Sequence, residues 1–197
     1  QTDCAAGTIS TTTAQTVCSN CGTGTYAAGT GNTVCAVAAK GYYVSTTAAS
    51  EQSACAAGKY QGSTGQTDCD DCTEGSYSTG AASVCSVCSA GYIAASTAGP
   101  SCDACAAGTY SNTERTACID CVAGKYSGGA VGACSDVDGG YYAANATNDY
   151  VGETGTAATQ QLICNDGWYS QGGIYDCVEA LIGYYATDST NAENVDN

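Results

Sequence analysis

Residues 105–121 read CAAGTYSNTERTACIDC, and residues 55–72 read CAAGKYQGSTGQTDCDDC. Both stretches have a leading cysteine, a glycine three residues later, a tyrosine five residues later and a second cysteine thirteen or fourteen residues after the first. The pattern recurs in both directions along the chain, which predicts a repeat protein. We expect one continuous array of eleven repeats over residues 1–197, starting at Cys4, Cys21, Ala38, Cys55, Cys72, Cys88, Cys105, Cys121, Val137, Cys164 and Ala180.

The composition limits how such a chain can be stabilised. Among 197 residues there are 16 Cys, 26 Gly and 15 Tyr, with no Phe, Met or His, so an ordinary core of large apolar side chains is excluded. Cysteine at this density is typical of disulfide scaffolds from oxidising compartments. We therefore predict an extracellular or cell-surface protein.

Two repeats that lack cysteine indicate what the other cysteines do. The repeat that starts at Ala38 has Gln52 at its closing position, and the repeat that starts at Val137 has Gln161 there. Both cysteines are missing together, as expected if each disulfide joins the two ends of one repeat, because losing one partner would leave a stray thiol. The predicted disulfides are Cys4–Cys18, Cys21–Cys35, Cys55–Cys69, Cys72–Cys85, Cys88–Cys102, Cys105–Cys118, Cys121–Cys134 and Cys164–Cys177.

The CxxC pairs allow two other interpretations, zinc binding and redox chemistry. CDDC at 69–72 and CSVC at 85–88 have a spacing that a four-cysteine zinc site tolerates, but the remaining cysteines outside CxxC pairs would be orphaned: Cys4, Cys35, Cys55, Cys134, Cys164 and Cys177. A thioredoxin-like role needs a βαβ context, which the sequence does not have. We interpret the CxxC pairs as seams between consecutive repeats, with no metal and no cofactor.

The predicted fold class is a small disulfide-rich repeat, an elongated rod of units of about 17 residues with short β-hairpins and little or no helix. Closing one such loop by a disulfide contributes about 3 kcal/mol, while ordering each residue costs about 1–2 kcal/mol, so a repeat must stack mainly on the repeats before and after it. The stacking side chains are expected to be the tyrosines at a fixed repeat position, Tyr26, Tyr43, Tyr60, Tyr77, Tyr110, Tyr126, Tyr142, Tyr169 and Tyr185, with Ile9 and Ile93 as substitutes.

Repeats that lack a leading cysteine have a second tyrosine beside the first. Tyr42 precedes Tyr43, Tyr141 precedes Tyr142, and Tyr184 precedes Tyr185. Either the added apolar burial offsets the missing disulfide, or these repeats meet a partner surface.

The stretch CAAGTYSNTERTAC resembles the ephrin-receptor-like cysteine-rich repeat and the single-disulfide module of tumour-necrosis-factor-receptor-like domains. In those repeats a Cys-x-x-Gly-x-Tyr start closes on a cysteine about fourteen residues later, although they usually begin Cys-Pro. Similar arrays occur in protist surface antigens and in algal flagellar-hair proteins. The resemblance implies an extracellular rod or coat, and we transfer no ligand site from it.

The first and last repeats suggest how copies join. Gln1 stands where a closing cysteine would, as Gln52 and Gln161 do, and the repeat begun at Ala180 stops before its closing position. One hypothesis is head-to-tail assembly, in which the heterologous contact does not close and produces a filament. The alternative is that a longer repeat protein continues beyond this stretch.

Candidate modification and ion sites are few. Asn145 heads the sequon NAT and is a candidate for N-glycosylation, and Thr11, Thr12 and Thr13 are candidates for O-glycosylation. Asp70 with Asp71, or Asp136 with Asp138, offers carboxylates for calcium, but without EF-hand spacing these are better interpreted as solvated acidic faces.

The function that we expect is structural: a subunit of an extracellular filament, surface hair or coat, partnered by copies of itself and by glycans. With no His and only four Lys and Arg, the chain lacks the residues of Ser-His-Asp or Cys-His catalysis, so we predict a non-enzyme. The net charge of −15 argues against nucleic acid and anionic membranes as partners. No apolar run approaches the roughly 18 residues that would span a bilayer, so we expect no direct membrane insertion. The alternative is a receptor or adhesin ectodomain that binds a protein or carbohydrate, with Trp168 as a contact.

Overall fold

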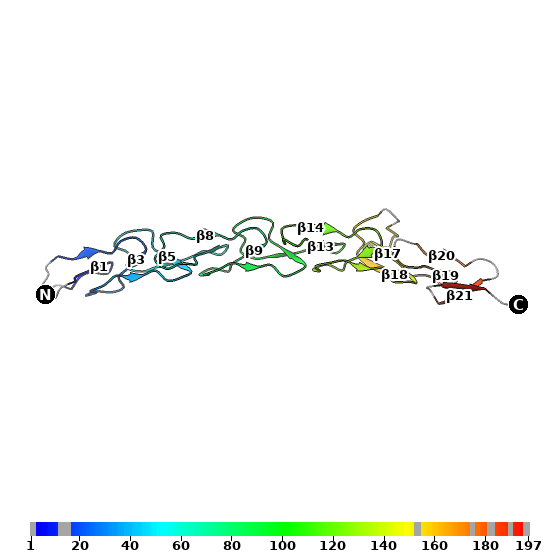
Figure 1. Ribbon diagram of the computed structural model, residues 1–197, viewed down its shortest axis with the longest axis horizontal. Coiled ribbons are helices and arrows are strands. Elements are labelled where there is room, and N and C mark those ends of the chain that lie inside the picture. The colour runs from blue at the N-terminus through cyan, green and yellow to red at the C-terminus, as the bar shows by residue number, and fades with distance from the viewer. Residues whose placement is uncertain are drawn as a thin grey trace. The chain divides into compact units, whose positions relative to one another are not determined.

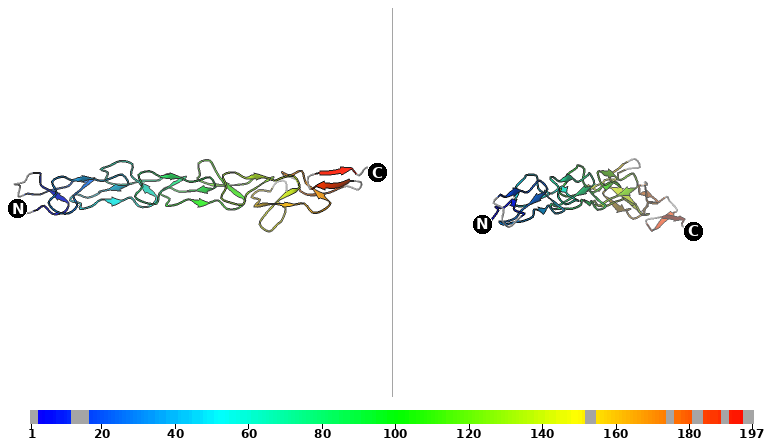
Figure 2. Two further views of the ribbon diagram at one scale, coloured as in Figure 1. Left: turned by 90° about the horizontal axis from the view of Figure 1, so that it is seen from below. Right: turned by 60° about the vertical axis from the view of Figure 1, so that its left-hand side comes forward.

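The computed structural model of the chain describes residues 3–11, 17–151, 155–173, 176–180, 184–188 and 191–194, the last two ranges as strands. Two compact bodies are present, Gln1–Cys88 with Ala94–Cys102, and Ser89–Ile93 with Asp103–Asn197. The described residues contain no helix, and within each body the hairpins follow one another in chain order (Figures 1 and 2). A row of short hairpins is the architecture that the sequence predicts.

Every named strand belongs to an antiparallel two-stranded sheet with its neighbour in the chain. In the first body the pairs are β1 (Thr8–Ile9) with β2 (Ser19–Asn20), β3 (Thr25–Tyr26) with β4 (Ala36–Val37), β5 (Tyr42–Tyr43) with β6 (Ser53–Ala54), β7 (Lys59–Tyr60) with β8 (Asp70–Asp71), and β9 (Ser76–Tyr77) with β10 (Ser86–Val87). In the second body they are β11 (Tyr92–Ile93) with β12 (Asp103–Ala104), β13 (Thr109–Ser111) with β14 (Cys118–Asp120), β15 (Lys125–Tyr126) with β16 (Ser135–Asp136), β17 (Tyr141–Ala144) with β18 (Gln160–Ile163), β19 (Trp168–Tyr169) with β20 (Val178–Glu179), and β21 (Tyr184–Asp188) with β22 (Asn191–Asn194).

The local reason for each hairpin is a turn that ends in glycine. In the fourth repeat the Lys59 amide donates to the Ala56 carbonyl at 3.0 Å, and Gly58 has φ 83° at the third turn position. A positive φ at that position is the signature of a type II turn, which favours glycine. The chain then runs outward as β7 and returns as β8, so the middle residues of the CDDC seam form the second strand.

Consecutive repeats are joined by main-chain hydrogen bonds. Between the fourth and fifth repeats, the Gly58 amide donates to the Ser78 carbonyl at 2.9 Å, and the Cys72 amide donates to the Gly58 carbonyl at 2.9 Å. The Ala81 amide of the fifth repeat also donates to the Cys55 carbonyl of the fourth, at 2.8 Å. The first of these bonds recurs as Gly7 to Ala27, Gly24 to Val44, Gly41 to Gln61 and Gly108 to Ser127. Stacking is therefore carried by backbone groups.

Contacts also reach the second repeat along, which the sequence did not lead us to expect. A Cβ added at Gly58 would collide with the carbonyl group of Ala98, two repeats away. The glycines at the same position in other repeats face the corresponding carbonyl groups in the same way, in the pairs Gly7 with Ala48, Gly24 with Gly65, Gly41 with Ala81, and Gly108 with Ala157. This glycine is thus needed twice, for its φ and for its lack of a side chain.

The buried side chains are mostly small, and they recur at the same two positions of successive repeats. The leading residues of the first ten repeats are almost inaccessible, from 0% exposed at Cys21, Ala38, Cys72 and Cys121 to 7% at Cys164, whereas Ala180 is half-buried. The residue that follows the tyrosine is the second buried position, occupied by Ala27, Val44, Gln61, Ser78, Ala94, Ser111, Ser127, Ala143 and Ser170. The tyrosines themselves, from Tyr26 to Tyr169, are half-buried, and the side chain of Tyr185 lies outside the described part. Their role in stacking stays a prediction.

The close approach at the turn glycine gives a stability prediction. Gly58→Ala should destabilise the protein by at least about 2 kcal/mol, because alanine is strained at this φ and its methyl group meets a backbone carbonyl. Gly22→Ala is the matched control, since a Cβ there has nothing within 4 Å and sibling repeats carry Ala5, Ala56 and Ala106 at that position. Equal thermal or denaturant stability of the two variants would contradict this account of the glycine.

Candidate functional site

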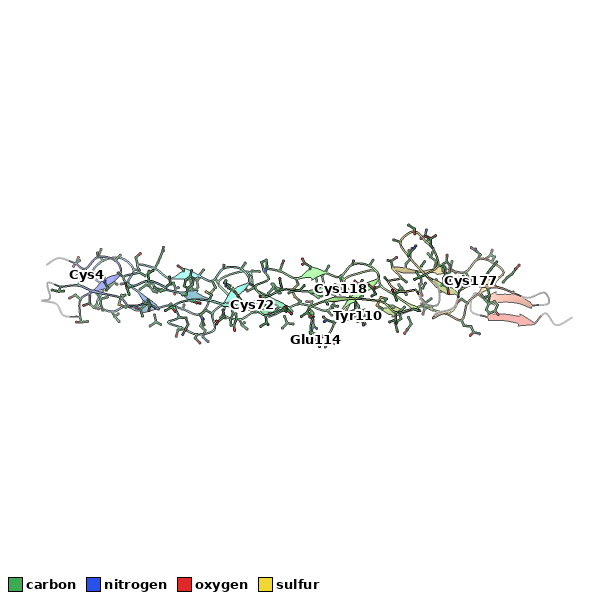
Figure 3. The ribbon with its side chains drawn as sticks, turned by 90° about the horizontal axis from the view of Figure 1, so that it is seen from above. Cys4, Cys72, Tyr110, Glu114, Cys118 and Cys177 are labelled. Carbon is green, nitrogen blue, oxygen red and sulfur yellow. A yellow bond between two sulfur atoms is a disulfide. The ribbon has the colours of Figure 1, made fainter. Side chains whose placement is uncertain are left out.

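Eight disulfides are the principal chemical feature of the chain. Each joins the leading and closing cysteine of one repeat: Cys4–Cys18, Cys21–Cys35, Cys55–Cys69, Cys72–Cys85, Cys88–Cys102, Cys105–Cys118, Cys121–Cys134 and Cys164–Cys177. Their Cα atoms lie between 5.6 and 5.8 Å apart, an ordinary disulfide separation. Cys4, Cys72, Cys118 and Cys177 are marked in Figure 3.

This bonding pattern removes the alternatives that a CxxC pair raises. No cysteine in the described part of the chain is a free thiol, so none offers a thiolate to zinc or to a redox partner. Across the same residues, no group of three or more Cys, Asp or Glu is arranged to hold a metal ion. Eight disulfides indicate folding in an oxidising environment of the secretory type.

Two of the repeats without a disulfide, those that start at Ala38 and Val137, are closed by glutamine instead. The Gln52 Oε1 atom accepts a hydrogen bond from the Ala39 amide at 2.7 Å, next to the leading position. In the other such repeat, Gln161 Oε1 accepts from the Asp138 amide at 2.8 Å, and Gln161 Nε2 donates to Asp138 Oδ2 at 2.9 Å. A side-chain hydrogen bond therefore connects the two ends of the repeat where the covalent bond is missing. The sequence signal was glutamine at both closing positions, and Gln1 lies outside the described residues.

The acidic pairs considered for calcium are on the surface. Asp71 forms an ion pair with Lys59 across the β7–β8 hairpin, and Asp136 forms one with Lys125 across β15–β16. The hydrogen bond from Lys59 to Asp71 raises the pKa of that lysine. Exposed pairs of this kind are screened by water and contribute little to stability.

The long loop of the ninth repeat is organised around the candidate glycosylation residue. Asn145 Oδ1 accepts hydrogen bonds from the Thr147 amide at 2.9 Å, the Thr147 hydroxyl at 2.8 Å and the Asp149 amide at 2.9 Å. Asp149 Oδ2 accepts from the Thr147 hydroxyl at 2.7 Å. The sequon thus lies in a hydrogen-bonded turn whose residues 146–149 are exposed. Thr11 is exposed as well, while Thr12 and Thr13 lie outside the described residues.

Two cavities open on the second body. The larger, of about 460 Å³, is lined by Tyr110, the backbone turn around Asn112, Glu114, Arg115 and Ile119. Tyr110 and Glu114 are labelled in Figure 3. Arg115 donates from an Nη atom to the Thr113 carbonyl at 3.0 Å, so it closes the turn of its own loop. The cavity is therefore a recess beside a locally closed loop.

The smaller cavity, of about 230 Å³, contains the candidate contact residue Trp168. Tyr142, Tyr150 and Trp168 line it together with Asn165, Asp176 and Cys177. The rings of Tyr142 and Tyr150 meet edge to face, with centroids 6.2 Å apart and planes at 69°. Trp168 is 40% exposed at the surface. The sequence pattern indicated Trp168 as a contact residue. It did not indicate that Tyr142 and Tyr150 line the same cavity, because Tyr150 lies in the long loop of the preceding repeat.

Comparison with known protein families and with curated proteins finds no match. Within the described residues there is no helix long and apolar enough to cross a membrane. The chain is thus a cysteine-rich repeat protein, in which eight of the eleven predicted repeats carry a disulfide and the described strands pair as short hairpins.

The glutamine closures predict that a disulfide can be introduced. Replacing Ala38 and Gln52 together by cysteine should form a disulfide and stabilise the protein by about 2 kcal/mol, because loop closure contributes about 3 kcal/mol and one hydrogen bond of about 1 kcal/mol is lost. Mass spectrometry of the non-reduced protein and thermal unfolding measure the two effects. Ala38→Cys alone is the control, and two free thiols in the double variant would contradict the prediction.

The hydrogen bonds at Asp149 predict a pKa change. Hydrogen bonds from Thr147 first and Asn145 second lower the pKa of the Asp149 carboxyl. Because the pKa is lowered, the charged carboxylate stabilises the loop at pH values above the ordinary carboxyl pKa. This contribution is lost as the pH falls through the lowered pKa. Thr147→Val should raise the Asp149 pKa, measured by NMR titration, while Thr147→Ser should leave it low. An unchanged pKa in the valine variant would show that the hydroxyl bond does not form in solution.

Proposed function

We propose that the chain is a structural subunit of an extracellular filament, surface hair or coat, assembled head to tail from copies of itself and carrying glycans. The observation that supports this most is the exchange of main-chain hydrogen bonds between consecutive repeats. Each repeat presents the same donors and acceptors to the next one, such as the Gly58 amide and the Cys55 carbonyl. A contact that repeats by translation is heterologous and does not close on itself.

The chemistry of the repeat suits a mechanical role. A disulfide or a glutamine hydrogen bond ties the two ends of nearly every repeat whose side chains are described, so pulling on the chain cannot easily unravel a hairpin. The bonds between repeats use backbone groups, which tolerate variation in the exposed side chains. The net charge of −15 makes separate copies of the chain repel one another.

The resemblance to ephrin-receptor-like and tumour-necrosis-factor-receptor-like repeats, and to arrays in protist surface antigens and flagellar-hair proteins, supports the same location and role. Asn145 and the threonine-rich stretch at 11–13 are the glycan positions that we assign to the assembled coat. The exposed sequon turn leaves room for such a glycan.

Assembly is tested on the secreted, oxidised protein. We expect the sedimentation coefficient to rise with concentration and electron micrographs to show filaments whose subunits continue the repeat spacing, because assembly follows mass action. Reduction with a thiol reagent should abolish the filaments, since the repeats then lose their cross-links. A protein that stays monomeric at every concentration, with its glycans retained, would overturn the filament proposal.

A receptor or adhesin ectodomain is the second candidate function. The observation that favours it is the cavity of Tyr142, Tyr150 and Trp168, where three aromatic side chains meet polar groups at the surface. Such a cluster is typical of a binding site, whereas scattered exposed side chains are not.

A further inference from the structure

The cavity at Trp168 has three aromatic walls that come from separate parts of the second body. Tyr142 lies in β17, Trp168 lies in β19, and Tyr150 lies in the long loop that separates β17 from β18. The two tyrosine rings stand at 69° to each other and form a corner. Such an arrangement presents ring faces and edges from different directions to one small volume.

The polar part of the cavity is negative. Asp176 contributes a carboxylate, of which Oδ1 accepts a hydrogen bond from the Cys177 amide at 2.7 Å. That bond restrains the rotation of the carboxylate, which has a second oxygen that can accept. Among the described residues that line the cavity there is no Lys or Arg. Glu179 is the residue paired with Trp168 in the β19–β20 hairpin, and Asp166 lies two residues before Trp168 in the chain. Further carboxylates therefore lie near the cavity.

The charge decides between the ligands that aromatic rings recognise. A ring face attracts a cation within about 6 Å of its centroid, and a neighbouring carboxylate strengthens that attraction. Phosphorylated, sulfated or carboxylated ligands are disfavoured, because the site is acidic and the whole chain carries −15. A neutral sugar would use the rings and Asn165 but not the excess negative charge. The cavity therefore fits a cation best.

The volume of the cavity restricts the ligand to a small cation whose surface consists of methyl groups. Pockets for drug-sized ligands occupy about 300–1,000 Å³, and this cavity, at about 230 Å³, is smaller. A trimethylammonium group spreads its charge over methyl groups that can contact several rings, and it needs no hydrogen-bond acceptor. A bare ammonium or metal ion would have to exchange its hydration shell for ring faces.

We propose that Tyr142, Tyr150, Trp168 and Asp176 form a binding site for a quaternary ammonium cation of the choline type. Binding of this kind deepens the second candidate function and does not depend on filament assembly. The site is complete within one copy of the chain, so it can be tested on dilute protein below the concentration at which filaments form.

The first test uses the single tryptophan of the chain as its own reporter. Titration with tetramethylammonium and with choline should change the Trp168 fluorescence with a Kd on the order of millimolar, typical of a small cation on aromatic rings. The matched probe is 3,3-dimethyl-1-butanol, which has the shape of choline without its charge and should bind at least about fivefold more weakly. Equal binding of the two probes, or no binding of either cation, would overturn the proposal.

Variants locate the site by calorimetry. Asp176→Asn keeps the oxygen that accepts from the Cys177 amide, so the fold is retained, and it should weaken choline binding about three- to tenfold while leaving the neutral probe unchanged. Trp168→Leu should abolish choline binding. Tyr92→Ala is the control, because Tyr92 is 38% exposed but lies outside this cavity. Thermal unfolding of each variant separates loss of the site from loss of the fold.

Two further probes test the ligand class. Phosphocholine should bind more weakly than choline, because its phosphate meets the negative surface. A panel of neutral monosaccharides is expected to leave the Trp168 fluorescence unchanged. Saccharide binding without choline binding would overturn the cation assignment and make the cavity a sugar site instead. Filament formation is measured separately, so failure of either proposal leaves the other standing.

Discussion

The interaction on which the rest of the structure depends is the main-chain hydrogen bond between the turn glycine of one repeat and the next repeat. The Gly58 amide reaches the Ser78 carbonyl, and the Gly58 carbonyl receives the Cys72 amide, so one residue connects two repeats through both of its backbone groups. A side chain at this position would collide with the carbonyl group of Ala98, two repeats away, and the positive φ of Gly58 turns the chain into the hairpin. Turn formation and stacking are therefore coupled at one position.

Cross-links within each repeat reduce the conformational entropy that the chain loses when the repeats stack. A hairpin of two-residue strands is unstable by itself in water, and the buried side chains here are mostly Cys, Ala, Val and Ser. The disulfide restricts the unfolded loop, whereas Gln52 and Gln161 replace that covalent constraint by hydrogen bonds to the backbone. Because a hydrogen bond contributes less than a disulfide, the repeats closed by glutamine depend more on their neighbours.

The ninth repeat departs from the others and produces the surface feature with the clearest binding chemistry. Its long loop carries Asn145 and Tyr150, and it returns through β18, which is longer than the corresponding strand of most other repeats. Tyr150 thereby comes to lie against Tyr142 and beside Trp168 of the following repeat. The ligand site that we propose therefore depends on an insertion in one repeat of an otherwise regular array.

The sequence by itself determined the repeat, its register and the cysteine partners, because the spacing of Cys, Gly and Tyr and the joint loss of two cysteines are local or pairwise signals. Only the tertiary structure decided the contact with the second repeat along, the burial of the small residue after each tyrosine, and the hydrogen bonds of Gln52 and Gln161. The tertiary structure also decided that Tyr150 and Trp168 line the same cavity. These features depend on how far each repeat rotates and rises relative to the last, and that geometry is set by backbone packing, which residue spacing does not encode.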